Sequence, residues 1–152
     1  MAVRPKKKPA ARITARQREA LAPVRDGIAS LREPVGSLSE AKVRQLAESC
    51  RKAAIGKKAD ATVLLDIRKK ATFADYFVLA TGRSVIQARA VADAVVEESE
   101  SEFGSPIRIE GYKDGAWILV DYGAVIVHVF TPQAREFYNL ERLWGKPAAT
   151  RK

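Results

Sequence analysis

Apolar residues recur at helical spacing in the stretch that begins at residue 37. Ser37 and Glu40 have the spacing of a capping box, which satisfies free backbone N–H groups where a helix begins. The apolar positions that follow fall on one helical face: Val43, Leu46, Ala47, Cys50 and Ala54. Gly56 is typical of a helix end, so we predict a helix over residues 37–56. Cys50 lies in the apolar stripe, and we interpret it as a small buried residue rather than a nucleophile.

Two continuous apolar runs and a second helical pattern come next. Residues 61–67 and 76–81 have the composition and the length of largely buried strands. Ser84 and Gln87 have a second capping-box spacing, and the apolar positions behind them predict a helix that ends at Gly104.

The remaining chain alternates short apolar runs with turn residues. We predict strands at residues 107–110, 116–121 and 124–130, followed by a last helix that begins at Thr131 and Pro132. The order of elements is α-β-β-α-β-β-β-α. This order predicts an α/β fold in which a mixed five-stranded sheet is flanked by helices.

The last two strands are close enough in sequence to form an antiparallel hairpin. With Tyr122-Gly123 as a two-residue turn, Trp117 lies opposite His128 on one face, and the other face is aliphatic core. A bulged turn shifts the register by one residue and exchanges the faces. Two interpretations of the Trp117 face stay open: it meets another protein, or a helix of the same chain covers it.

Charge divides the chain into a basic end and a neutral body. The 152 residues are 47% hydrophobic and 30% charged, with a net charge of +9. Residues 1–33 hold nine Lys or Arg and three Asp or Glu, which leaves +6, whereas residues 61–152 hold twelve of each sign. We predict a basic, mostly disordered tail over residues 1–36, a domain over 37–146 and a short tail over 147–152. The N-terminal tail is either a solubilising segment without a partner or an arm that lies along nucleic-acid phosphates.

The sequence predicts a cytoplasmic location without membrane association. Its longest apolar runs, such as residues 124–130, have the length of a strand and not of a membrane span. The basic N-terminus is not followed by the apolar stretch of a secretory signal.

Residues that carry chemistry are few. His128 is the only histidine and Cys50 the only cysteine, so we expect no metal site and no cofactor. We interpret His128 as a half-buried sheet residue with one hydrogen-bonded ring nitrogen. Residues 81–84 have the strand, turn and helix order that favours anions, and nucleotidyltransferases follow such a turn with two aspartates that hold magnesium. Only Asp93 follows here, so the sequence favours a capped helix start and no enzymatic activity.

Several blocks of sequence occur in a recognisable order between residues 40 and 146. These are residues 73–82 (FADYFVLATG), Glu110-Gly111, residues 117–123 (WILVDYG), 125–130 (VIVHVF) and 135–144 (REFYNLERLW). Together they resemble the ribosomal silencing factor family, whose plant relative is called Iojap.

The resemblance implies a nucleotidyltransferase-like fold that has lost catalysis. It implies binding to the fourteenth protein of the large ribosomal subunit, on the face that meets the small subunit, so that the subunits cannot join and translation falls. It also implies a homodimer when the protein is free. Carried over by matching position, the partner-binding residues are Glu110, Trp117, Asp121, Tyr122, His128 and Tyr138. The alternative is a nucleotidyltransferase-like nucleotide-binding protein.

Two features depart from the family pattern. Ala124 stands where members usually have an acidic residue, which puts one electrostatic contact or turn cap in doubt. The long basic N-terminal segment is not part of the shared core. Because of its charge, we hypothesise that it contacts ribosomal RNA near the docking site.

Overall fold

The computed structural model describes residues 13–21 and 38–145. In chain order, its elements are α1 (Ala15–Leu21), α2 (Glu40–Gly56), β1 (Asp60–Asp66), β2 (Tyr76–Thr81), α3 (Val85–Phe103), β3 (Arg108–Glu110), β4 (Trp117–Asp121), β5 (Val125–Phe130), α4 (Pro132–Tyr138) and α5 (Leu140–Trp144). The predicted mixed five-stranded sheet flanked by helices is confirmed. The predicted domain boundaries at residues 36 and 147 lie outside the described residues.

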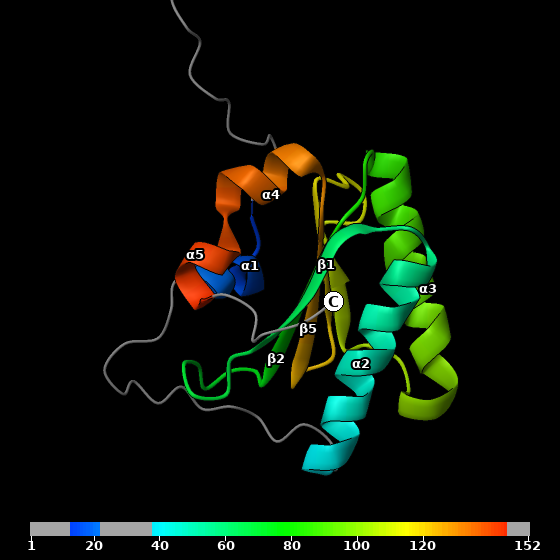
Figure 1. Cartoon of the computed structure of the whole chain (residues 1–152), viewed down its shortest axis with the longest axis vertical. Helices are drawn as coiled ribbons and strands as arrows, with labels where there is room; N and C mark the ends of the chain where they lie inside the picture. The colour runs from blue at the N-terminus through cyan, green and yellow to red at the C-terminus, as the bar shows by residue number, and fades with distance from the viewer. Residues whose placement is uncertain (1–12, 22–37, 146–152) are drawn as a thin grey trace, which may run out of the picture.

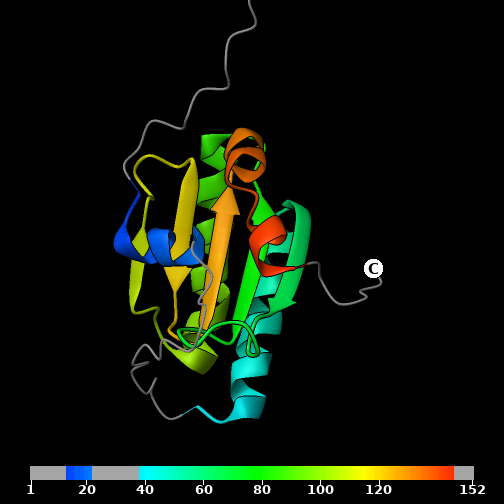
Figure 2. The same ribbon diagram turned by 90° about the vertical axis from the view of Figure 1, so that its left-hand side faces the viewer.

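The sheet has the strand order β1-β2-β5-β4-β3. Its β2 and β5 strands are parallel, and the other neighbouring strands are antiparallel. Helices α2 and α3 cover one face, whereas α1, α4 and α5 lie on the other side (Figure 1). Seen from that other side, α1 crosses in front of β3 and β4, and α5 lies to the right of β5 (Figure 2). The sheet is therefore the middle of three layers.

Capping side chains explain where the helices begin. Ser84 and Thr131 are the N-caps of α3 and α4, as the sequence predicts, and each side chain accepts a hydrogen bond from a backbone N–H three residues later. Helix α2 differs, because its N-cap is Ser39, whose hydroxyl accepts from the N–H of Lys42. The prediction of Ser37 as the cap is therefore wrong by two residues, and Ser37 itself lies outside the described residues.

The predicted last helix consists of two short helices. Asn139 separates α4 from α5 in the left-handed conformation, with φ of 44°, which asparagine adopts more readily than most residues. Its side chain then caps α5 by accepting from the N–H of Arg142. The break turns Leu140 and Trp144 toward the sheet, where both are buried. One continuous helix was expected, and the difference is due to this single backbone conformation.

The hairpin of β4 and β5 forms, but its predicted register is wrong. Trp117 lies opposite Phe130 instead of His128. The turn is centred one residue later than predicted, on Gly123 and Ala124, because the Tyr122 N–H donates to the Val125 carbonyl at 2.9 Å and the Asp121 carboxylate accepts from the N–H of Gly123 at 2.7 Å. The error is two residues, so every side chain of the hairpin stays on its predicted face.

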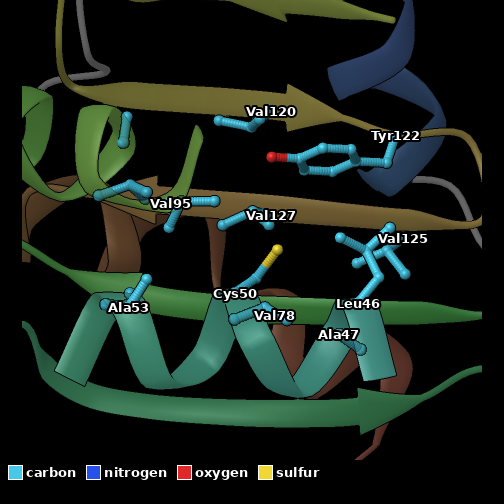
Figure 3. Close-up of a cluster of buried hydrophobic side chains, with 14 of the residues drawn as sticks. Leu46, Ala47, Cys50, Ala53, Val78, Val95, Val120, Tyr122, Val125 and Val127 are labelled. Carbon is cyan, nitrogen blue, oxygen red and sulfur yellow. The ribbon is translucent and has the colours of Figure 1, made fainter. Parts of the chain in front are cut away.

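A first core lies between the sheet and helices α2 and α3. Cys50 points from α2 toward the valines of the sheet, and Tyr122 enters the same core from the end of β4 (Figure 3). Cys50 is fully buried, as predicted, and burial raises the pKa of its thiol to about 12. The thiol is therefore protonated and shielded at neutral pH.

Part of the segment predicted to be disordered is a packed helix. In α1, the side chains of Gln17 and Ala20 are buried, and the indole Nε1–H of Trp144 donates to the Ala20 carbonyl at 2.6 Å. The sequence predicts only a transient helical turn over residues 14–22 within this mostly disordered tail, and α1 is instead a packed helix. The physical reason is that its contacts join residues more than a hundred positions apart, which no local pattern reveals. Residues 1–12 and 22–36 lie outside the described residues.

Because Cys50 is buried between α2 and the sheet, its thiol is expected to react with an aromatic disulfide reagent only after unfolding. In native buffer, the absorbance of the released thiolate should stay flat, and it should rise across a denaturant series together with the loss of circular dichroism. Rapid stoichiometric labelling of the folded protein would contradict the packing between α2 and the sheet.

Candidate protein-docking face

The sheet face opposite α2 and α3 carries a cluster of rings, which we call the aromatic face. It consists of Phe73, Phe77, Trp117, His128, Phe130, Tyr138 and Trp144. The ring centroid of Trp117 lies 5.1 Å from that of Phe130 and 4.4 Å from that of Tyr138. Tilted and edge contacts of this kind stabilise beyond the burial of area alone. The cluster therefore forms a packed platform to which β2, β4, β5, α4 and α5 all contribute rings.

His128 is the polar centre of this platform. It is fully buried, which exceeds the predicted half-burial, and its Nδ1 accepts from the indole Nε1–H of Trp117 at 3.0 Å. The proton of the neutral ring then sits on Nε2, which has no hydrogen-bond partner among the described residues. Burial, helped by the positive charges of Arg16 and Arg135, lowers the pKa of His128 to about 3. The imidazole is neutral at physiological pH and positions Trp117.

Asp121 is buried and surrounded by donors. Its Oδ2 accepts from Arg16 Nε at 2.8 Å and from Arg108 Nη1 at 3.0 Å, while Oδ1 accepts from the Gly123 N–H. A buried carboxylate is costly unless it is paired and hydrogen-bonded. These three donors supply that compensation, and two of them are guanidinium groups, from α1 and β3. Asp121 thus ties α1, β3 and the β4–β5 turn together.

Tyr122 belongs to the opposite side of the sheet. Its hydroxyl lies 2.6 Å from the Ser99 hydroxyl of α3, inside the core that also holds Cys50. Burial raises the pKa of Tyr122 well above its ordinary value. The structure therefore separates Tyr122 from the other five candidate residues by the thickness of the sheet.

Glu110 and Tyr138 form the accessible rim of the aromatic face. Both are partly exposed, whereas Trp117 is only 4% exposed. Glu110 Oε2 lies 3.7 Å from Arg108 Nε, and its Oε1 has no hydrogen-bond partner among the described residues. Of the six residues, these two are the ones whose side chains reach the surface.

Sequence reasoning missed the polar residues that are distant in sequence but hydrogen-bond to Asp121 and Trp117. Arg16 and Gln17 come from α1, and the Gln17 Nε2 donates to the Trp117 carbonyl at 3.0 Å. Arg108 comes from β3. The only available signal was the helical spacing of residues 14–22, which is too short to indicate a stable helix.

The turn that leads from β2 into α3 is a capped helix start. Ser84 Oγ accepts from the N–H of Gln87 at 3.1 Å, and Gln87 Oε1 accepts from the N–H of Arg83 at 3.0 Å. These are the N–H groups that a bound anion would use at a helix N-terminus. Asp93, the first carboxylate that follows the turn, accepts from the Tyr112 hydroxyl at 3.1 Å. The geometry favours a structural role for this turn.

Residues 13–21 and 38–145 contain neither a metal-binding cluster nor a membrane-spanning helix. No three His, Cys, Asp or Glu side chains lie together in a way that suits a metal ion. No helix in these ranges combines the length and the apolar character needed to cross a membrane.

The lowered pKa of His128 predicts a specific loss of stability in acid. The unfolded state has the ordinary histidine pKa near 6.5, so it binds more protons than the native state between about pH 3 and pH 6.5. Stability therefore falls as pH is lowered through this window, by at most about 1.4 kcal/mol per pH unit for one group. His128→Gln keeps an acceptor for Trp117 but does not titrate. Urea unfolding at several pH values should give a flatter dependence for the variant; identical slopes would contradict the assignment.

The buried cluster around Asp121 predicts a large effect of a small substitution. Asp121→Asn keeps the bond from Gly123 but removes the charge that Arg16 and Arg108 share, at an expected cost of about 1–3 kcal/mol of unfolding free energy. The exposed pair of Asp66 and Arg68 is the matched control, and Asp66→Asn should cost less than about 1 kcal/mol. Equal losses in chemical denaturation would contradict the role of burial.

Comparison with known proteins identifies the family. The model of the family described as "ribosomal silencing factor during starvation" matches residues 40–152, more than half of the chain. The ribosomal silencing factor of Zymomonas mobilis is 43% identical over 76 residues, which are 50% of this chain and 57% of the relative. A mouse protein named mitochondrial assembly of ribosomal large subunit protein 1 is 29% identical over 84 residues, 53% of this chain and 37% of the relative.

A solved structure agrees with the sequence matches. The crystal structure of a protein from Chromobacterium violaceum superimposes with a TM-score of 0.66 at 29% identity, and covers 72% of this chain and 92% of that one. Helix α1 precedes the region matched by the family model. On the family match, and with the fold in agreement, the chain belongs to the ribosomal silencing factor family.

Proposed function

We propose that this protein binds the large ribosomal subunit through its fourteenth ribosomal protein, sterically blocks joining of the small subunit and so represses translation. The observation that carries the proposal is the family match over residues 40–152, which contains the whole aromatic face. The name of the mouse relative links that protein to assembly of the large ribosomal subunit, which supports the same partner. The protein acts by occupying a surface and not by catalysis.

The rim residues make the direct contacts in this proposal. Tyr138 offers a partly exposed ring that lies tilted against that of Trp117, and tyrosine is enriched where binding energy concentrates. Glu110 offers a partly exposed carboxylate, whose Oε2 lies 3.7 Å from Arg108 Nε. A basic ribosomal protein supplies arginine or lysine for such a carboxylate. Trp117 and His128 lie beneath the rim and hold it in place.

The basic N-terminal segment adds electrostatic affinity by contacting ribosomal RNA. Its support is the charge of +6 over residues 1–33, since cationic groups near phosphates release counterions and bind without sequence preference. A chain lacking residues 1–12, which removes five of these cations, should lose affinity for large subunits mainly at low salt. Equal affinity of the two chains across a salt series contradicts this contact.

In the free state the protein forms a homodimer. The support is the outer strand β3, which contains Ile109 with 42% of its surface exposed and is preceded directly by Ile107 with 57% exposed. An open strand edge with apolar side chains is suited to pairing with a second chain. Light scattering should give twice the chain mass for the wild type, and the mass of one chain at every concentration contradicts the dimer.

The function is tested by sedimentation of purified ribosomal subunits. Wild-type protein should co-sediment with large subunits and reduce the amount of joined ribosomes. Tyr138→Ala should weaken both effects, with a loss on the order of 1–3 kcal/mol in binding. Phe103→Ala is the matched control, because this partly buried ring packs on the opposite side of the sheet.

A second pair of variants tests the proposed contact of the Glu110 carboxylate with a basic partner. Glu110→Gln should reduce affinity for large subunits, whereas Glu97→Gln, an exposed position on α3, should not. Each variant is first compared with wild type by circular dichroism. Failure of the wild type to bind large subunits, or equal binding by Tyr138→Ala and Phe103→Ala, contradicts the proposed docking face.

A further inference from the structure

We propose that helix α1 occupies the docking face within the free protein and must leave its site before a basic partner can bind there. The inference rests on the proposed function and adds a regulatory role for the N-terminal segment. The structural observation is that α1, which precedes the family match, lies against two of the candidate partner-binding residues, Trp117 and Asp121.

The site of α1 is built from polar contacts at the end of β3. Gln17 Nε2 donates to the Trp117 carbonyl, at the point where the chain leaves β3 and the ladder to β4 stops. The chain passes this carbonyl so closely that a β-carbon on Gly111 would lie 2.2 Å from it. The Trp117 carbonyl of β4 therefore accepts its hydrogen bond from outside the sheet, and Gln17 of α1 is the donor.

Arg16 takes the place of a partner's cation. Its guanidinium donates to Asp121, and it also lies over the ring of Phe73 at 5.4 Å. A basic ribosomal protein would recognise this face through the same two features, a carboxylate and an aromatic ring. With α1 in place, the carboxylate is occupied and the partner's arginine or lysine is excluded.

The helix is suited to leaving its site. It has seven residues, fewer than the 12–15 that an isolated helix needs, so it is helical only while it is packed. Ala20 is its one fully buried apolar side chain among the described residues, while Ile13 and Leu21 are partly buried. Most of its attachment is polar, and a partner can replace each polar contact with one of its own. In competition of this type, the apparent affinity for the partner equals the intrinsic affinity multiplied by the fraction of molecules in which α1 is released.

The indole N–H groups of the two tryptophans report on α1 in the full chain. Trp144 Nε1–H donates to Ala20 of α1, whereas Trp117 Nε1–H donates to His128 within the sheet. Exchange of these two protons, followed by NMR, therefore separates release of α1 from loosening of the whole domain.

The test compares Arg16→Ala with Arg18→Ala in the full chain. Both remove one charge from α1, but Arg18 is exposed and Arg16 pairs with Asp121. Arg16→Ala should accelerate exchange at Trp144, leave Trp117 protected and bind large subunits more tightly, by about tenfold if α1 is seated nine times in ten. Arg18→Ala should match wild type. Ala20→Asp, which places a charge at the buried contact, should act like Arg16→Ala.

Each other outcome overturns the inference in a distinguishable way. Release of α1 at Trp144 without tighter binding, relative to Arg18→Ala, overturns the inference and leaves the proposed function standing. Protection of Trp144 in both Arg16→Ala and Ala20→Asp means that α1 is a fixed part of the core, which also overturns it. If no variant and no wild type bind large subunits, the proposed function fails and the inference fails with it.

Discussion

Burial of the central strands on both faces is the constraint on which the structure depends. Every residue of β2, β4 and β5 is buried, so the sheet needs a complete layer of cover on each side. Helices α2 and α3, of 17 and 19 residues, provide it on one side. On the other side α4 and α5 have seven and five residues, and α1 packs beside them. The thinly covered side is the one that carries Trp117.

The same constraint explains why the candidate residues divide into support and contact. A tryptophan, a histidine and an aspartate in the middle of a covered sheet must satisfy their polar atoms internally, and they do so through the Trp117–His128 bond and the Asp121 cluster. A residue at the rim is free of that requirement. Substituting a buried member of the set therefore changes stability together with binding, whereas Tyr138 and Glu110 allow binding to be tested more separately.

The sequence predicts the strands and the two long helices well because their signals are local. Apolar runs define β2 and β5, and hydroxyl caps at Ser84 and Thr131 define helix starts. The hairpin register was predicted wrongly because the turn lies on Gly123 and Ala124, closed by the bond from the Tyr122 N–H to Val125, which spacing does not reveal. Neither the face of Tyr122 nor the position of α1 follows from local pattern, since each depends on partners distant in sequence, Ser99 and Trp117 respectively.

The most direct test of the account is an electron cryo-microscopy map of the full chain bound to purified large ribosomal subunits. The account predicts density on the fourteenth ribosomal protein, with the rim of Glu110 and Tyr138 against it, the small-subunit interface covered and no density for α1 at its site beside Trp117. Density at another place on the subunit, or the chain bound with α2 and α3 toward the ribosome, would contradict the assigned docking face.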